Sequence, residues 1–280
     1  MEITRLRTCH LTNPVGYMMD PVTLSFQVEG AAGTLIKETR IEISTTEDFS
    51  ECLYDTGMRT DIDPLCFIPE IKWLERTRYF WRVTVLDNVK EMAISDVAFF
   101  ETPADRINGK WIKSPFDKDK HSVFMKKWEL PDDCIRARLY ITSLGLYEAY
   151  INGEKVSDEY LTPFYNDYNH WIQYQTFDLT SSIRKGGNAL GIMLGNGWYK
   201  GRFGFIDKLD RLYGDTQQFV CELEMTMADG KKMTVSSDES FGCALSPVIE
   251  SSIYDGEVYD SRKEIQDWAQ YSRAKEGYVR

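Results

Sequence analysis

The side chains best suited to chemistry in this chain include two pairs of carboxylates. Hydrolysis of a glycosidic bond uses two carboxyl groups that flank the scissile bond, and Glu148 with Asp158, or Asp255 with Glu257, could form such a pair. Asp255 and Glu257 are two residues apart in an extended segment, so they would share one face. The alternative is that these groups face solvent or pair with Lys and Arg. The sequence favours this alternative, because 44 acidic residues make such pairs common and nothing ties them to a pocket. No catalytic residue is predicted.

A second group of side chains would suit sugar binding. Aromatic rings stack on the C–H faces of a sugar, while amides and charged groups fix its hydroxyls in a small concave site. The candidates are Asn166, Asp167, Asn196, Trp198, Tyr199 and Arg202. Asn166 and Asp167 also carry the hard oxygen atoms that calcium prefers, whereas no other metal or cofactor is predicted. The alternative is that Trp198 and Tyr199 are packing residues and that Asn196 only accommodates a turn.

The elements that would position these residues are short strands. Residues 146–151 alternate in the period of a strand, and Asn152-Gly153 then suits a hairpin turn with positive φ angles. Residues 171–177 indicate a further strand, and the apolar run 189–194 fits a strand buried on both faces. Gly195-Asn196-Gly197 follows it as a tight turn. Many short strands with turn signals between them predict a two-sheet jelly-roll β-sandwich over residues 122–262. The absence of a helical pattern of ten residues argues against a parallel α/β fold.

Residues 1–103 form a separate β domain by the same criteria. The spacing of Leu74, Thr77 and Tyr79 predicts a tyrosine corner, in which the tyrosine hydroxyl bonds to backbone a few residues upstream. Residues 104–121 are polar and indicate a linker. The predicted fold class is therefore all-β: a fibronectin-III/immunoglobulin-like sandwich followed by a jelly-roll β-sandwich.

Composition excludes several classes of protein. The net charge of −11 and the pI of about 4.9 argue against binding nucleic acid. No apolar run is long enough for a membrane span or for a signal peptide, so we expect a cytoplasmic protein without a membrane partner. The six cysteines lack CxxC spacing, which indicates buried, reduced thiols in place of zinc ligands.

Several motifs in the second half occur in a specific order. They are Gly145-Leu146-Tyr147-Glu148, Ile151-Asn152-Gly153, Leu161-Thr162-Pro163, Tyr174-Gln175, Asn188-Ala189-Leu190-Gly191, Leu194-Gly195-Asn196-Gly197-Trp198-Tyr199 and Gly256-Glu257-Val258-Tyr259-Asp260-Ser261-Arg262. This set resembles the N-terminal β-sandwich domain of bacterial alpha-L-rhamnosidases. The first half, with Leu11-Thr12-Asn13-Pro14, Tyr79-Phe80-Trp81-Arg82-Val83 and Phe100-Glu101-Thr102, resembles the fibronectin-type-III-like module that precedes it.

The resemblance implies an accessory role. In that family the catalytic acid and base lie in an (α/α)6 barrel that follows these β domains, and its Asp-Glu-Arg-x-Gly-Trp-x-Gly-Asp-like segment does not occur here. Residues 263–280 would then begin the connection to the barrel, which would be a partner within the same polypeptide. We expect a non-catalytic front of an enzyme acting on terminal alpha-L-rhamnosides, and leave open whether this chain is itself an enzyme.

Two other functions remain open at this point. Some family members have a related domain that binds L-rhamnose with a calcium ion, so the jelly roll could be a stand-alone carbohydrate-binding module. The aromatic-rich residues 160–174 could alternatively form a surface for a protein partner.

Overall fold

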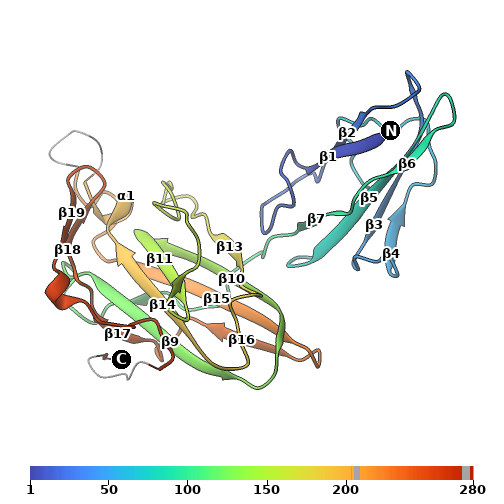
Figure 1. Ribbon diagram of the computed structural model, residues 1–280. Coiled ribbons are helices and arrows are strands. Elements are labelled where there is room, and N and C mark those ends of the chain that lie inside the picture. Colours follow the sequence, from blue (N-terminus) through green and yellow to red (C-terminus); the bar gives the residue numbers. More distant parts are fainter. Residues whose placement is uncertain (203, 205–208, 273–277, 280) are drawn as a thin grey trace. The chain divides into compact units, whose positions relative to one another are not determined.

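The computed structural model describes residues 1–202, 204, 209–272 and 278–279. The chain divides into two compact units, Met1–Asp105 and Arg106–Arg280, and strands dominate both (Figure 1). The predicted all-β class is confirmed. Among the described residues, no helix has the length and apolar character needed to cross a membrane.

The first unit is a β-sandwich with one apolar core. Its sheet has the order β4-β3-β5-β6, with β7 also paired to β5, and β1 pairs with β2 in a separate ladder. Side chains from both ladders, including Leu24, Phe26, Ile41 and Trp81, meet in the core. The strands are β1 (Glu2–Thr8), β2 (Leu24–Glu29), β3 (Ile36–Ser44), β4 (Cys52–Asp55), β5 (Arg78–Asp87), β6 (Met92–Ile94) and β7 (Ala98–Glu101).

The tyrosine corner is present. The Tyr79 hydroxyl oxygen accepts a hydrogen bond from the backbone N–H of Leu74 at 2.9 Å. The Tyr79 ring is buried between Trp73 and Phe100, at centroid distances of 4.9 and 5.4 Å. This contact confirms the prediction from local spacing.

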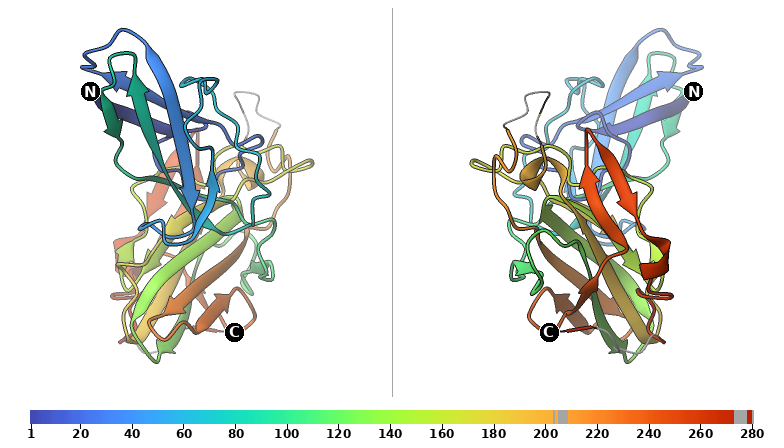
Figure 2. Two further views of the ribbon diagram at one scale, coloured as in Figure 1. Left: turned by 90° about the vertical axis from the view of Figure 1, so that its right-hand side faces the viewer. Right: turned by 90° about the vertical axis from the view of Figure 1, so that its left-hand side faces the viewer.

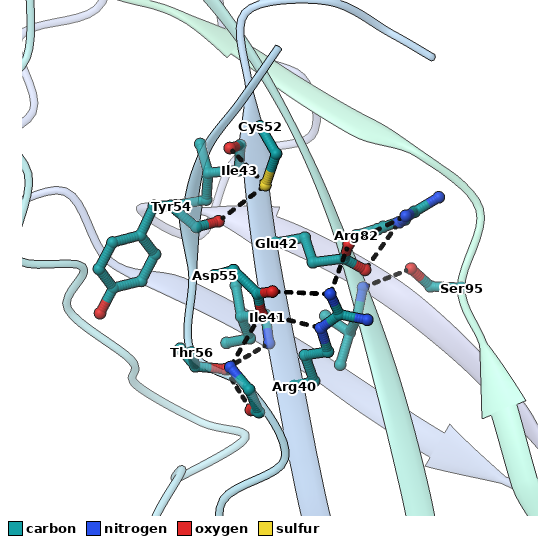
Figure 3. A network of polar contacts seen from close by, with 12 residues as sticks. Arg40, Ile41, Glu42, Ile43, Cys52, Tyr54, Asp55, Thr56, Arg82 and Ser95 are labelled. Atoms are coloured by element: carbon teal, nitrogen blue, oxygen red, sulfur yellow. Dashed lines mark hydrogen bonds and ion pairs between the residues drawn. The ribbon is translucent and has the colours of Figure 1, made fainter. Parts of the chain in front are cut away.

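A network of ion pairs connects three strands of this unit (Figure 3). Buried Glu42 accepts two hydrogen bonds from the Arg82 guanidinium at 2.9 and 3.0 Å. Arg40 makes a similar two-point contact with Asp55 and lies 3.2 Å from Glu42. The hydrogen bond from Arg40 lowers the pKa of Asp55. Because Glu42 is on β3, Arg82 on β5 and Asp55 on β4, this network of ion pairs helps to fix the register of the three strands.

The second unit consists of two five-stranded sheets and a hairpin. One sheet has the order β13-β10-β15-β16 with β8 on β15, the other β12-β11-β14-β9-β17, and β18 pairs with β19. Alternate side chains from the facing strands form one large core, as a jelly-roll sandwich requires. The elements are β8 (Ile112–Lys113), β9 (Ser122–Leu130), β10 (Cys134–Leu144), β11 (Leu146–Ile151), β12 (Glu154–Lys155), β13 (Gln175–Asp178), β14 (Gly186–Gly195), α1 (Gly197–Lys200), β15 (Gln218–Met227), β16 (Lys232–Ser236), β17 (Gly242–Leu245), β18 (Val248–Ser252), β19 (Gly256–Tyr259) and the 3₁₀ turn η1 (Ser261–Lys263).

Two segments differ from the predicted domain boundaries. The predicted linker 104–121 contains β8, which pairs with β15, and Phe116 packs against the core of the second unit. Residues 263–280 were predicted to begin the connection to a following domain, but described residues of this segment pack back on the second unit. Its Trp268, Ala269 and Tyr271 lie against glycines of β14. The sequence missed both because β8 has only two residues and the returning segment has no strand pattern.

Two local predictions were also too broad. The strand expected over residues 171–177 is shorter and later, since β13 spans Gln175–Asp178. All six cysteines are free thiols, and Cys221 and Cys243 are buried as predicted. Cys52 and Cys66, however, are exposed, so the prediction of burial is wrong for these two.

Candidate functional site

Two of the six predicted site residues, Trp198 and Tyr199, lie in an aromatic cluster of the second unit. Trp198 on α1 meets Tyr165 edge to face at 6.1 Å, and Tyr199 meets Tyr168 at 5.1 Å. Tyr213 contacts Tyr168 at 5.1 Å, and its hydroxyl lies 2.9 Å from that of Tyr165. Trp198 and Tyr199 are half-buried in this cluster, so packing occupies part of each ring.

Asn166 and Asp167 have different surroundings. Asn166 is fully buried, its carboxamide oxygen accepts a hydrogen bond from Gln173 N–H at 2.8 Å, and its nitrogen donates to the Phe164 carbonyl. Asn166 therefore holds the loop in shape. Asp167 is partly exposed, with its carboxylate 3.8 Å from His170. Calcium prefers six to eight oxygen ligands, so a calcium ion here would need oxygen atoms beyond the Asp167 carboxylate and the Asn166 oxygen, and calcium binding stays a prediction.

The same loop exposes a patch of large apolar side chains. We call this the aromatic loop patch; it consists of Tyr160, Leu161, Phe164, Tyr165 and Trp171. Tyr160 is 74% exposed and Trp171 56% exposed, far more than packing residues of a core. Leu161 and Phe164 adopt φ angles of +61° and +70°, and such backbone is strained for bulky residues. A strained loop that presents aromatic side chains is typical of a binding surface.

Asn196 lies outside the aromatic cluster, where it is half-buried and hydrogen-bonded in a chain with the buried side chains of Gln217 and His121. Gln217 donates to the Nδ1 atom of His121 at 3.1 Å and to the Asn196 side-chain oxygen at 2.8 Å. The Asn196 nitrogen then donates to the Ser251 carbonyl at 2.9 Å. This chain joins α1 to the β18–β19 hairpin, which lie side by side in Figure 1 and Figure 2. Burial and the nearby Lys200 cation lower the pKa of His121, which favours the neutral ring whose Nδ1 atom accepts the hydrogen bond from Gln217.

Arg202 and the proposed carboxylate pairs are held by structural contacts. Arg202 pairs with Asp255 at 2.8 Å, and that contact lowers the pKa of Asp255. Glu257 is exposed on β19. Glu148 accepts hydrogen bonds from the hydroxyl of Tyr150 and from Lys155, both at 2.6 Å. The carboxylates considered for glycoside cleavage thus pair with cations or face solvent, as the alternative interpretation predicted.

Sequence reasoning did not identify Lys200, His121 and Gln217 as a group. Lys200 is 4% exposed although lysine is among the least buried residue types, and His121 is equally buried. His121 and Gln217 are 96 residues apart in the chain. No local pattern marks such a cluster, because it exists only after the strand ends meet.

The fold defines the class of the protein first: two successive β-sandwich units, of which the second carries aromatic and polar side chains in its loops. Residues 132–280 match the family model described as the alpha-L-rhamnosidase N-terminal domain, and residues 3–104 match the Rha78A-like N-terminal immunoglobulin domain. Because the first match alone covers more than half of the chain, the chain belongs to the alpha-L-rhamnosidase N-terminal domain family.

Individual relatives agree with this assignment. An alpha-L-rhamnosidase of Formosa agariphila is 30% identical over 279 residues, covering 91% of this chain and 30% of the relative. The solved alpha-L-rhamnosidases of Aspergillus terreus and Dictyoglumus thermophilum have TM-scores of 0.87 and 0.85 at 27% and 26% identity. Each alignment covers 99% of this chain and 33% of the solved chain. The chain therefore spans about a third of these relatives.

Proposed function

We propose that this chain is the non-catalytic N-terminal region of an alpha-L-rhamnosidase that acts on terminal alpha-L-rhamnosides. The observation that carries the proposal is the match of both units, in order, to the N-terminal modules of that family. The structural roles of the candidate carboxylates support it, since Glu148 pairs with Lys155 and Asp255 with Arg202. The remaining two thirds of the relatives would then supply the catalytic groups.

The role of the region in such an enzyme is support of the catalytic domain, and the aromatic loop patch is the surface we assign to that contact. Its five side chains are between 43% and 74% exposed, so covering them would remove further apolar surface from water. Each square ångström of apolar surface covered contributes about 25 cal/mol. Exposed Trp and Tyr are also the residue types enriched at the centres of interfaces.

The experiment is a rate assay with para-nitrophenyl alpha-L-rhamnoside. It compares the 280-residue chain with the longest product of its gene at equal molar concentration. We expect hydrolysis only by the longer protein, and Trp171→Ala in that protein should lower its thermal stability without abolishing the rate. Hydrolysis by the 280-residue chain alone would contradict the proposal and would direct mutagenesis to Glu148 and Glu257.

A second candidate function is the binding of free L-rhamnose. The exposed rings of Tyr165 and Trp171 favour it, because aromatic faces accept the C–H faces of a sugar. Calorimetry with L-rhamnose, run with and without calcium, tests this function separately from catalysis. Absence of heat at millimolar sugar in both conditions would refute it.

A further inference from the structure

A cavity lies at one end of the β-sandwich of the second unit, where strands of both sheets end. Its volume is about 340 Å³, within the range of about 300–1,000 Å³ that small-molecule sites occupy. β8 and the residues before β15 line it from one sheet, and β9 and β14 line it from the other. The loop from β8 to β9 completes the lining. We call it the lysine cavity; it consists of residues 113–118, 120, 122, 124, 194 and 216–217.

Cationic side chains prevail at the rim of the lysine cavity, although the chain as a whole has a net charge of −11. Lys113, Lys118 and Lys120 line the cavity and are exposed, with Asp117 as the one carboxylate among the described lining residues. Lys118 pairs with Asp215. Lys113 and Lys120 have no ion-pair partner within the part of the chain that the structure describes. An anion in the cavity can therefore form charge-assisted contacts with both of them.

The floor of the lysine cavity is apolar. Phe124 on β9 and Leu194 on β14 line it and are 1% and 3% exposed. Phe116 lines it from the loop and packs, partly buried, against the same core. An aromatic ring placed against these side chains would lose contact with water, which is favourable. An aromatic body thus suits the floor, and a negative charge on that body suits the rim.

Gln217 adds a buried acceptor to the lysine cavity. The residue lines the cavity and is 7% exposed. Its Nε2 atom donates to the Nδ1 atom of His121 at 3.1 Å and to the Asn196 side-chain oxygen at 2.8 Å. Its carboxamide oxygen has no hydrogen-bond partner among the described residues. A buried acceptor without a partner is unfavourable, so a hydroxyl group on a ligand would gain a hydrogen bond there.

We propose that the lysine cavity binds a small aromatic carboxylate that carries a ring hydroxyl. The ring would lie against Phe116 and Phe124. The carboxylate would lie beside Lys113 and Lys120, and the hydroxyl at the Gln217 oxygen. The rim selects a negative charge, the floor selects an aromatic body, and the buried amide selects a hydrogen-bond donor. The proposal is independent of the proposed function, because no residue of the lysine cavity belongs to the aromatic loop patch or to the candidate carboxylate pairs.

The test is calorimetric titration of the intact 280-residue chain with para-hydroxybenzoate at a pH of about 7, where its carboxyl group is ionised. We expect a dissociation constant of about 1 mM, as a ligand of about ten non-hydrogen atoms can reach. Benzoate, which lacks the hydroxyl, should bind about threefold or more weakly. The neutral para-hydroxybenzyl alcohol, which lacks the charge, should bind about fivefold or more weakly.

A charge variant with a matched control locates the ligand. Lys113→Gln combined with Lys120→Gln should weaken binding of para-hydroxybenzoate about fivefold, since each exposed ion pair contributes modestly. Both side chains are exposed, so this double variant should fold. Lys37→Gln combined with Lys232→Gln is the control, because it removes the same charge from two exposed lysines that do not line the cavity. The control should bind para-hydroxybenzoate as tightly as the unaltered chain does.

Three results would overturn the proposal. The first is no binding of para-hydroxybenzoate at roughly 20 mM, far above the expected dissociation constant. The second is equal affinity for para-hydroxybenzoate and either analogue, which would mean that the charge or the hydroxyl is not recognised. The third is binding that Trp171→Ala abolishes while the double variant at Lys113 and Lys120 leaves it intact, which would place the ligand on the aromatic loop patch. The rate assay on the longest gene product does not depend on any of these results.

Discussion

Replacement of Gly191 by alanine tests how the C-terminal segment is attached to the second unit. Gly191 lies on β14, and a Cβ atom added there would come within 2.6 Å of the Ala269 Cβ atom and 2.7 Å of the Trp268 ring. Carbon atoms in contact are separated by about 3.5–4.0 Å, so the segment must shift by about 1 Å. The strand is buried on both faces, so the new methyl group itself has no free space to occupy.

The expected cost follows from two opposing effects. Overpacking of this kind costs about 1–3 kcal/mol, and loss of glycine flexibility in the unfolded chain returns about 0.4–1 kcal/mol. A net loss of about 1–2 kcal/mol would lower the melting temperature of this unit by about 3–6 °C. Gly195→Ala is the matched control on the same strand, because its nearest contacts would be 3.3 and 3.7 Å away. We expect its melting temperature to be nearly unchanged.

Scanning calorimetry gives the melting temperatures, and hydrogen exchange of peptides from β14 assigns the transition to the second unit. The decisive comparison uses a chain ended after Lys263, which removes Trp268 and Ala269. Gly191→Ala should lower the stability of this shortened chain only slightly, because the atoms that the new methyl group would displace are gone. The difference between its effects in the full and the shortened chain is the coupling energy between Gly191 and the C-terminal segment. An equal cost in both chains would refute the packing of this segment on β14.

Three further predictions concern single contacts. Tyr79→Phe removes the hydroxyl that accepts the Leu74 N–H, so urea denaturation should show a loss of about 1–2 kcal/mol in the first unit, and an unchanged midpoint would contradict the tyrosine corner. Burial and the Lys200 cation lower the pKa of His121, so below a pH of about 6.5 the unfolded chain binds more protons than the folded one. The stability of the second unit should therefore fall as the pH drops below that value. His121→Asn should flatten this pH dependence of the melting temperature. Glu42→Gln leaves two arginines without their shared anion, which should cost about 1–2 kcal/mol by urea denaturation because both guanidinium groups keep part of their water.

The parts of the fold that the sequence predicts are those whose signal is local. The strands of the first unit and the Tyr79 contact follow from alternation and from a spacing of five residues. The buried strand β14 follows from an apolar run of six residues. In each case the residues that show the pattern are the same residues that form the strand or the contact. Which of these strands pair with each other is then given by the predicted fold class, the jelly roll.

Asn196 shows where local reasoning ends. Its position between two glycines predicted a turn, and the turn is present with Gly197 at a φ of +53°. Its amide was expected to face a ligand, but it bonds to Gln217 and Ser251, which are 21 and 55 residues further along the chain. An amide satisfied in this way is a positioning group, since its removal would separate α1 from the β18–β19 hairpin.

Lys200 shows the same limit of local reasoning for the burial of a charged side chain. A lysine in a polar, glycine-rich segment predicts an exposed side chain, and only the closure of α1 against residues 118–119 buries it. Burial then lowers the pKa of its ammonium group, the opposite of the effect expected for a surface ion pair. The free energy lost on burying that cation is recovered only by oxygen atoms brought near it. Here the Lys118 carbonyl, 82 residues earlier in the chain, and the Asp119 carboxylate supply those oxygen atoms, and a contact over such a separation leaves no local pattern in the sequence.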